Sequence, residues 1–177
     1  ISLQRRSPKR LRSRALRPAV RAPDRQRAAP QIDVPMTEVA FHLNVPDIGS
    51  YTCRLLRKAY LKGARVQVLA DAAQIDALDR GLWLMGQGEF VPHATSASSS
   101  RVRQRSPIVL GVERPEAAEV LVNLSSRMPE DAHAFGRVIE IVGSAEADRL
   151  QARQRWKQYR DGGLSPVAID LAASREA

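Results

Sequence analysis

Apolar residues in the part of the chain after residue 36 follow two alternating patterns. Short runs rich in Val, Ile and Leu, continuous or alternating with polar residues, are typical of strands. Between them lie longer segments in which apolar residues recur every three or four positions, as one face of a helix requires. The strand pattern predicts strands at residues 38–45, 65–70, 107–111, 119–124 and 137–142.

Helices are expected where helical spacing lies between start and stop signals. The last of them follows Gly143 and Ser144, which mark a helix start, and ends at Gly162 and Gly163. The segment at residues 94–106 is rich in Ser and Arg and is expected to be a polar loop. The expected helices cover residues 47–62, 71–85 and 149–160, with Glu146 inside the first turn of the last one and a shorter helix at 130–135.

This alternation favours one three-layer α/β domain. Short apolar strands joined through amphipathic helices pair in parallel, and helices cover both faces of such a sheet. We therefore expect a largely parallel sheet. Gly81, Gly86 and Gly88 lie at and beyond the end of a helix, and Gln87 stands where a phosphate-binding loop needs Lys. No nucleotide-binding glycine loop is expected.

The positive charge of the chain is concentrated at its N-terminal end. The formal net charge is +9, yet residues 1–35 hold 10 Lys/Arg and 2 Asp/Glu, and the later residues are nearly neutral with 18 and 17. The first segment is rich in Arg, Pro, Ala and Gln and lacks apolar periodicity, which is typical of disorder. We expect it to be an extension outside the native domain, with Met36 as the natural start and residues 36–177 as a single domain.

Removal of residues 1–35 should therefore leave the stability of the domain unchanged. The thermal unfolding midpoint of residues 36–177 is expected to equal that of the full chain within error. A drop of several degrees on truncation would show instead that the segment docks on the domain and stabilises it.

The sequence lacks the residue patterns that several kinds of functional site require. The single cysteine, Cys53, excludes an internal disulfide and a multi-cysteine zinc site. His42, His93 and His133 stand alone, without a carboxylate or cysteine at ligand spacing. No apolar run approaches the length that crosses a membrane. We expect no catalytic residue, no cofactor, no metal and a cytoplasmic location.

The last helix carries the most informative pattern, RLQARQRWKQYR. Arg149, Arg153, Trp156 and Arg160 fall on one face, with Lys157 beside them. Guanidinium groups bind carboxylates bidentately and an indole ring offers apolar area, so this face fits an acidic ligand with an aromatic end. The alternative is a solvated basic helix with a tryptophan at its border. The neighbouring arc, expected to pack inward, holds Ala145, Ala152 and Tyr159.

Two large aromatic residues, Trp83 and Phe90, flank the glycine-containing turn after the second helix. They form either a corner of the core or an exposed pair that anchors a partner. Their residue types alone favour the core corner, because aromatic side chains bury readily.

Taken together, these motifs resemble a known family. The order of elements, the pair Leu82 and Trp83 followed by FVPH at residues 90–93, and the final RQRWKQYRDGG are similar to the chi subunit of bacterial DNA polymerase III holoenzyme. The similarity spans residues 36–164. It implies a Rossmann-like fold without nucleotide binding. It also implies a non-catalytic accessory subunit that links the clamp loader, through the psi subunit, to the acidic C-terminal tail of single-stranded DNA-binding protein.

The resemblance also implies two sets of binding residues. The tail of single-stranded DNA-binding protein binds the last long helix in the family, at the positions of Arg149, Arg153, Trp156 and Lys157, with Arg160 on the same face. Family members often carry Lys and Tyr where this chain has Arg149 and Trp156. The surface for psi, or for an alternative helicase partner, corresponds to Trp83, Phe90, Val91 and His93.

A different class of function remains open from the residues. The basic N-terminal arm and the loop carrying Arg101, Arg103 and Arg105 could bind nucleic-acid phosphates directly. A chain that starts at Met36 discriminates the two, because an adaptor loses nothing and a direct binder loses most of its affinity. For an adaptor, DNA is reached only indirectly, and no membrane is involved.

Overall fold

The computed structural model describes residues 37–172 except residues 87, 89 and 112–117. Its strands are β1 (Glu38–Val45), β2 (Val66–Leu69), β3 (His93–Thr95), β4 (Ile108–Gly111), β5 (Val120–Asn123), β6 (Arg137–Gly143) and β7 (Val167–Asp170). Its helices are α1 (Ile48–Leu61), α2 (Ala72–Trp83), α3 (Ser100–Arg105), α4 (Glu146–Asp161) and the short 3-10 helix η1 (Ala132–Ala134). The expected extension at residues 1–35 lies outside the described residues.

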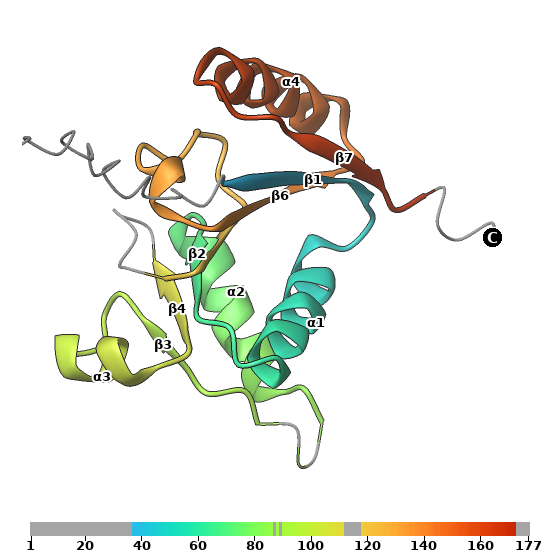
Figure 1. Cartoon of the computed structure of the whole chain (residues 1–177). Coiled ribbons are helices and arrows are strands. Elements are labelled where there is room, and N and C mark those ends of the chain that lie inside the picture. The colour runs from blue at the N-terminus through green and yellow to red at the C-terminus, as the bar shows by residue number, and fades with distance from the viewer. Residues whose placement is uncertain (1–36, 87, 89, 112–117, 173–177) are drawn as a thin grey trace, which may run out of the picture. The chain divides into compact units, whose positions relative to one another are not determined.

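The strands form a seven-stranded sheet in the order β3-β4-β2-β5-β6-β1-β7. Each neighbouring pair in it is parallel. Figure 1 shows α1 and α2 on one face of the sheet and α4 on the other. The expectation of a three-layer α/β fold with a largely parallel sheet is confirmed, and β3 and β7 are its two edge strands.

Local signals explain where the first two helices begin. The carboxylate of Asp47 accepts a hydrogen bond from the Ser50 N–H at 3.0 Å and caps α1. At the start of α2, Asp71 accepts from the Gln74 N–H at 2.8 Å, and the Gln74 side chain accepts from the Asp71 N–H at 3.1 Å. This reciprocal pair is a capping box. α1 stops before Gly63, whose φ of +76° is a left-handed conformation that glycine adopts without steric cost.

Side chains along β1 alternate between the two faces of the sheet, as the pleat of a strand requires. Val39 and Phe41 pack in the core beneath α4, together with Tyr159. His42 points to the opposite face, where its Nδ1 lies 2.8 Å from the hydroxyl of Tyr51 in α1. β1 therefore contributes to both faces of the domain.

The segment expected to be a polar loop, residues 94–106, contains regular structure instead. β3 includes its first residues and α3 its last ones. α3 follows Ser99, and the Arg103 guanidinium donates to the backbone carbonyls of Ser96 and Ser98. No residue of α3 is buried. The loop expectation was wrong because a helix without a buried face leaves no apolar periodicity in the sequence.

Three further details differ from the expectations. α4 begins after Ala145, which is exposed and forms no side-chain cap, so Ser144 does not cap the helix and Ala145 does not pack inward. Residues 130–135 contain only the 3-10 turn η1. β7 was not expected, since all four of its residues are exposed at the sheet edge.

Candidate partner-binding sites

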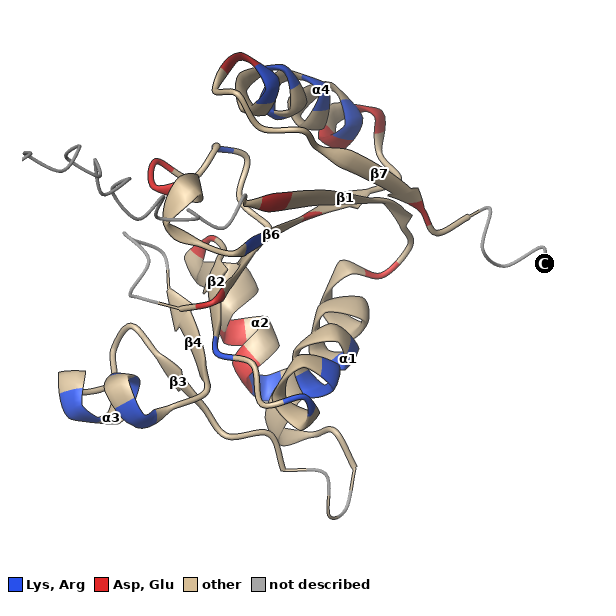
Figure 2. Cartoon of the chain, in the orientation of Figure 1, with Lys and Arg blue, Asp and Glu red and all other residues tan. Residues whose placement is uncertain are grey.

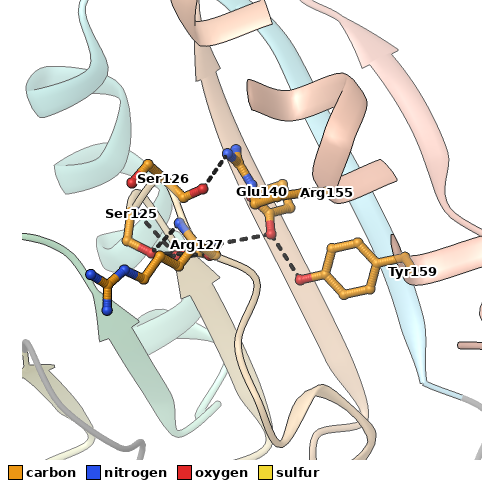
Figure 3. A network of polar contacts seen from close by, with 7 residues as sticks. Ser125, Ser126, Arg127, Glu140, Arg155 and Tyr159 are labelled. Carbon is orange, nitrogen blue, oxygen red and sulfur yellow. Dashed lines mark hydrogen bonds and ion pairs between the residues drawn. The ribbon is translucent and has the colours of Figure 1, made fainter. Parts of the chain in front are cut away.

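A buried polar network centred on Glu140 of β6 fixes α4 to the sheet (Figure 3). Arg155 donates from Nε to Glu140 Oε2 at 2.9 Å, and Tyr159 donates its hydroxyl to Oε1 at 2.8 Å. Asn123, at the end of β5, donates to the same Oε1 at 2.9 Å. The side chains of Glu140 and Arg155 are 0% and 6% exposed, so water does not screen this ion pair.

The same network also orders the loop that follows β5. Arg155 Nη1 donates to the carbonyl of Ser126 at 3.3 Å. The Asn123 amide donates to the carbonyl of Arg127 at 2.9 Å and accepts from the Ser125 N–H at 3.0 Å. One side of α4 is thus tied to two strands and a loop, which leaves the other side of the helix as a rigid platform.

Burial sets the protonation behaviour of this network. It raises the pKa of the Glu140 carboxyl, while the Arg155 guanidinium and the donated hydrogen bonds oppose the rise. Burial and the neighbouring Glu140 raise the pKa of Tyr159, so its hydroxyl remains a donor. The sequence reading missed the network. A glutamate inside the apolar run RVIEIV was the signal, because a charge buried in a strand requires a partner.

On the side of α4 away from Arg155 lies a groove of about 620 Å³. We call it the α4 groove. Its floor is apolar, and the Trp156 ring packs on Phe41 of β1 with centroids 5.0 Å apart. Trp156 is half-buried and so presents part of its ring to the groove. The lining residues are Phe41, Leu43, Asn44, Arg149, Ala152, Arg153, Trp156 and Ala168.

Two arginines form the charged rim of the α4 groove, and both are held only weakly. Arg149 donates to Asn44 Oδ1 at 3.0 Å and lies 3.8 Å from Glu146, and Arg153 lies 3.5 Å from Glu146. These ion pairs are exposed, so each contributes little to stability. An incoming carboxylate can therefore replace Glu146. Asn44 adopts a φ of +58° and also donates to Asp170 at 2.9 Å, which fixes its oxygen toward Arg149.

The structure divides the basic face that the helical period predicts. Arg149, Arg153 and Trp156 come together in the α4 groove. Lys157 and Arg160 are exposed on the same helix but do not line the groove. Phe41, Leu43, Asn44 and Ala168 were not expected, because they come from β1 and β7, far from α4 in the sequence.

A second candidate surface lies at the end of α2, beside β3. Trp83 and Phe90 are 62% and 58% exposed, with ring centroids 5.3 Å apart. The core-corner interpretation of this pair was therefore wrong, because both side chains are largely in solvent and their rings pack against each other. Leu84, which the sequence reading missed, is also exposed next to Trp83. We call Trp83, Leu84 and Phe90 the aromatic patch.

The other two residues assigned to this surface lie beneath it. Val91 is buried in the core on the α1 and α2 face. The His93 side chain is buried, and its ring lies 5.6 Å from the ring of Trp83. Its Nε2 lies 3.1 Å from Asp79 Oδ1, and its Nδ1 lies 2.7 Å from the Val91 carbonyl oxygen. His93 and Val91 therefore support the patch from below, and Trp83 and Phe90 form its surface.

The described part of the fold also shows where the remaining candidate residues for metal binding, membrane insertion or nucleic-acid contact lie. Its His, Cys, Asp and Glu residues form no group of three or more that could hold a metal ion. Cys53 is a free, buried residue of α1. None of the described helices has both the length and the apolar character needed to cross a bilayer. On α3, Arg103 is engaged with the backbone, whereas Arg101 and Arg105 are exposed.

The fold and these two surfaces define a Rossmann-like α/β domain whose candidate sites are a groove and a patch on its outside. A family model of the DNA polymerase III chi subunit, HolC, matches residues 36–167. The chain belongs to this family, the chi subunits, which are accessory subunits of the DNA polymerase III holoenzyme.

Individual relatives agree with the family match. The DNA polymerase III subunit chi of Pseudomonas aeruginosa is 33% identical over 136 residues, covering 72% of this chain and 92% of its own. That of Haemophilus influenzae is 31% identical over 115 residues, covering 64% of this chain and 80% of its own.

Among solved structures, the C-terminal domain of the DEAD-box protein Dbp5 covers 77% of this chain and 91% of its own at 12% identity, with a TM-score of 0.48.

Proposed function

We propose that this chain is a non-catalytic bridge between the clamp loader and single-stranded DNA-binding protein. In this proposal the α4 groove receives the acidic C-terminal tail of single-stranded DNA-binding protein, and the aromatic patch receives the psi subunit or an alternative helicase. The α4 groove carries the proposal, because it combines two weakly paired arginines with an apolar floor. The family resemblance supplies the identity of the partners.

The chemistry of the groove fits an acidic peptide with an aromatic end. Arg149 and Arg153 present guanidinium groups at the rim, where they can bind side-chain and terminal carboxylates bidentately. The terminal ring of such a peptide can lie on the floor made by Phe41 and Trp156. The network behind α4 holds this surface in place before the ligand arrives, which reduces the ordering cost of binding.

Arg153→Glu should weaken binding of an acidic peptide that ends in a free-carboxylate Phe by about 1–2 kcal/mol, and Arg153→Ala by about half as much. The charge reversal costs more because it adds repulsion to the lost attraction. Raising salt from low to physiological levels should weaken binding without abolishing it, since the apolar contact is less sensitive to screening. Titration with a fluorescently labelled form of this acidic peptide measures both effects.

Arg101→Glu is the matched control for this titration. Arg101 is an exposed arginine on α3, so the substitution changes the net charge equally without touching the groove. It should leave peptide affinity nearly unchanged. If it weakens binding as much as Arg153→Glu does, attraction is diffuse and α4 holds no specific pocket.

A further inference from the structure

A second groove, of about 480 Å³, lies on the opposite face of β1, between α1 and the sheet. We call it the α1 groove. Phe41 faces the α4 groove, and the next residue, His42, lines the α1 groove. The two grooves therefore lie on opposite sides of the sheet. The lining residues that matter here are Arg54, Lys58, Lys62, Arg137, Ile139 and Ile169.

Positive charge lines one side of the α1 groove. Arg54, Lys58 and Lys62 follow each other at intervals of four along α1 and its C-terminal cap, and all three are exposed. Figure 2 shows the Lys and Arg positions gathered along this helix. The ion pairs found among the described residues include none of these three, although hydrogen bonds from Ser50 and the nearby Arg54 lower the pKa of the Asp47 carboxyl. Arg137 lies 3.1 Å from Glu38. The helix dipole accounts for cations in the last turn but not for Arg54, which lies further back.

The floor of the α1 groove is apolar and carries no acid. Ile139 of β6 and Ile169 of β7 contribute to it, and Ile169 is partly exposed. His42 is tied to the Tyr51 hydroxyl at 2.8 Å, with the rings in a T-shaped contact at 5.8 Å. Burial, together with the nearby Arg137, lowers the pKa of His42, so the His42 ring is uncharged at neutral pH.

We infer that the α1 groove receives an acidic amphipathic segment of a protein partner. Apolar side chains of that segment lie on Ile139 and Ile169, and its carboxylates bind the row of cations on α1. Charge complementarity identifies the occupant. The longest part of this chain outside the described residues is strongly basic and would be repelled.

A protein segment fits this groove better than a nucleic acid does. Single strands gain much of their affinity from bases stacked on open aromatic rings. The aromatic ring that lines this groove, Tyr51, is half-buried and packs edge-on against His42. The apolar floor would also gain nothing from phosphates, whereas it would bury the apolar face of a helix.

The test uses the full chain, labelled with nitrogen-15, and a synthetic helical peptide with Leu on one face and Glu on the other. We expect saturable shifts of amide signals in α1, β6 and β7, and no binding of the same peptide with Lys in place of Glu. Arg54→Glu combined with Lys58→Glu should weaken binding about tenfold. Ile169→Asp should weaken it as well.

Arg101→Glu combined with Arg105→Glu is the matched control, since it reverses two exposed arginines on α3 and should change affinity little. The inference fails if this control loses as much affinity as the α1 variant. It also fails if shifts map to the α4 groove, if the Phe-ended acidic peptide displaces the probe, or if oligothymidylate binds the α1 groove more tightly. Success or failure here is independent of the proposal for the α4 groove.

Discussion

Arg155→Met should lower the free energy of unfolding by about 3–5 kcal/mol, because it leaves the buried Glu140 carboxylate without its cation. For a domain of this size the loss corresponds to a fall of roughly 10 °C or more in the unfolding midpoint. Chemical denaturation and a thermal scan followed by circular dichroism measure the two quantities. The substitution also removes the hydrogen bond that Arg155 donates to the Ser126 carbonyl.

The deficit should shrink as the pH falls. Burial raises the pKa of Glu140, and removal of Arg155 takes away the main opposing effect. A carboxyl whose pKa is higher in the folded state than in the unfolded state binds more protons when folded. Its contribution to stability is then present at low pH and is lost as the pH rises through the folded pKa. Arg155→Met should accordingly be closer to the unmodified protein near pH 5 than near pH 7.

Two control variants separate this cause from general damage to α4. Arg153→Met removes an exposed arginine from the same helix and should change stability by no more than about 0.5 kcal/mol. Glu140→Gln combined with Arg155→Met removes both buried charges and should recover part of the loss. A double variant as unstable as Arg155→Met at every pH would show that packing, and not the unpaired charge, dominates.

Trp83→Ala or Phe90→Ala should weaken binding of a psi subunit by about 2 kcal/mol or more, close to thirtyfold or greater. Paired exposed aromatic rings are typical anchors of interfaces, since they bury large apolar areas with little loss of side-chain freedom. The fold should survive each change, because each residue already exposes more than half of its surface to solvent. Calorimetric titration with purified psi measures affinity, and circular dichroism checks the fold.

Leu150→Ala provides the matched control for the aromatic patch. Leu150 is another large exposed apolar residue, but it lies on α4 near the other edge of the sheet. Its removal should leave psi affinity unchanged. Normal psi binding by a folded variant that lacks both Trp83 and Phe90 would contradict the anchor role.

Strands of four or more residues with a buried face were predictable from the sequence, whereas the edge strands β3 and β7 were not. β1 was expected with the bounds that it has, because its apolar residues fill two cores. β7 has exposed residues throughout, and β3 has three residues, so neither leaves enough apolar pattern to detect. Apolar spacing and the glycines that follow located α1 and α2, whereas the start signal expected for the last helix does not cap it, because α4 begins without a side-chain cap.

The candidate sites were predictable as far as local spacing reaches. A helical period alone brings Arg149, Arg153 and Trp156 to one face. It does not show where that face meets the sheet, which is why Lys157 and Arg160 were grouped with the groove that they do not line. For the aromatic pair, exposure depends on where the fold places both side chains, and residue type alone gave the opposite expectation.

The positions of the two proposed partner sites also have a mechanical meaning. The aromatic patch lies beside edge strand β3, and the α4 groove lies over β1 and β7, close to the other edge. With neighbouring strands about 4.8 Å apart, the sites are separated by roughly 25–30 Å across the sheet. Tension between two bound partners would run across the strands and along the hydrogen bonds between them, the direction in which a sheet can be opened one strand at a time. Two buried hydrogen bonds run along this direction. One joins Arg155 of α4 to Glu140 of β6, and the other joins Asn123 of β5 to the same glutamate. These buried side-chain contacts would resist the separation of α4, β6 and β5 under such a load.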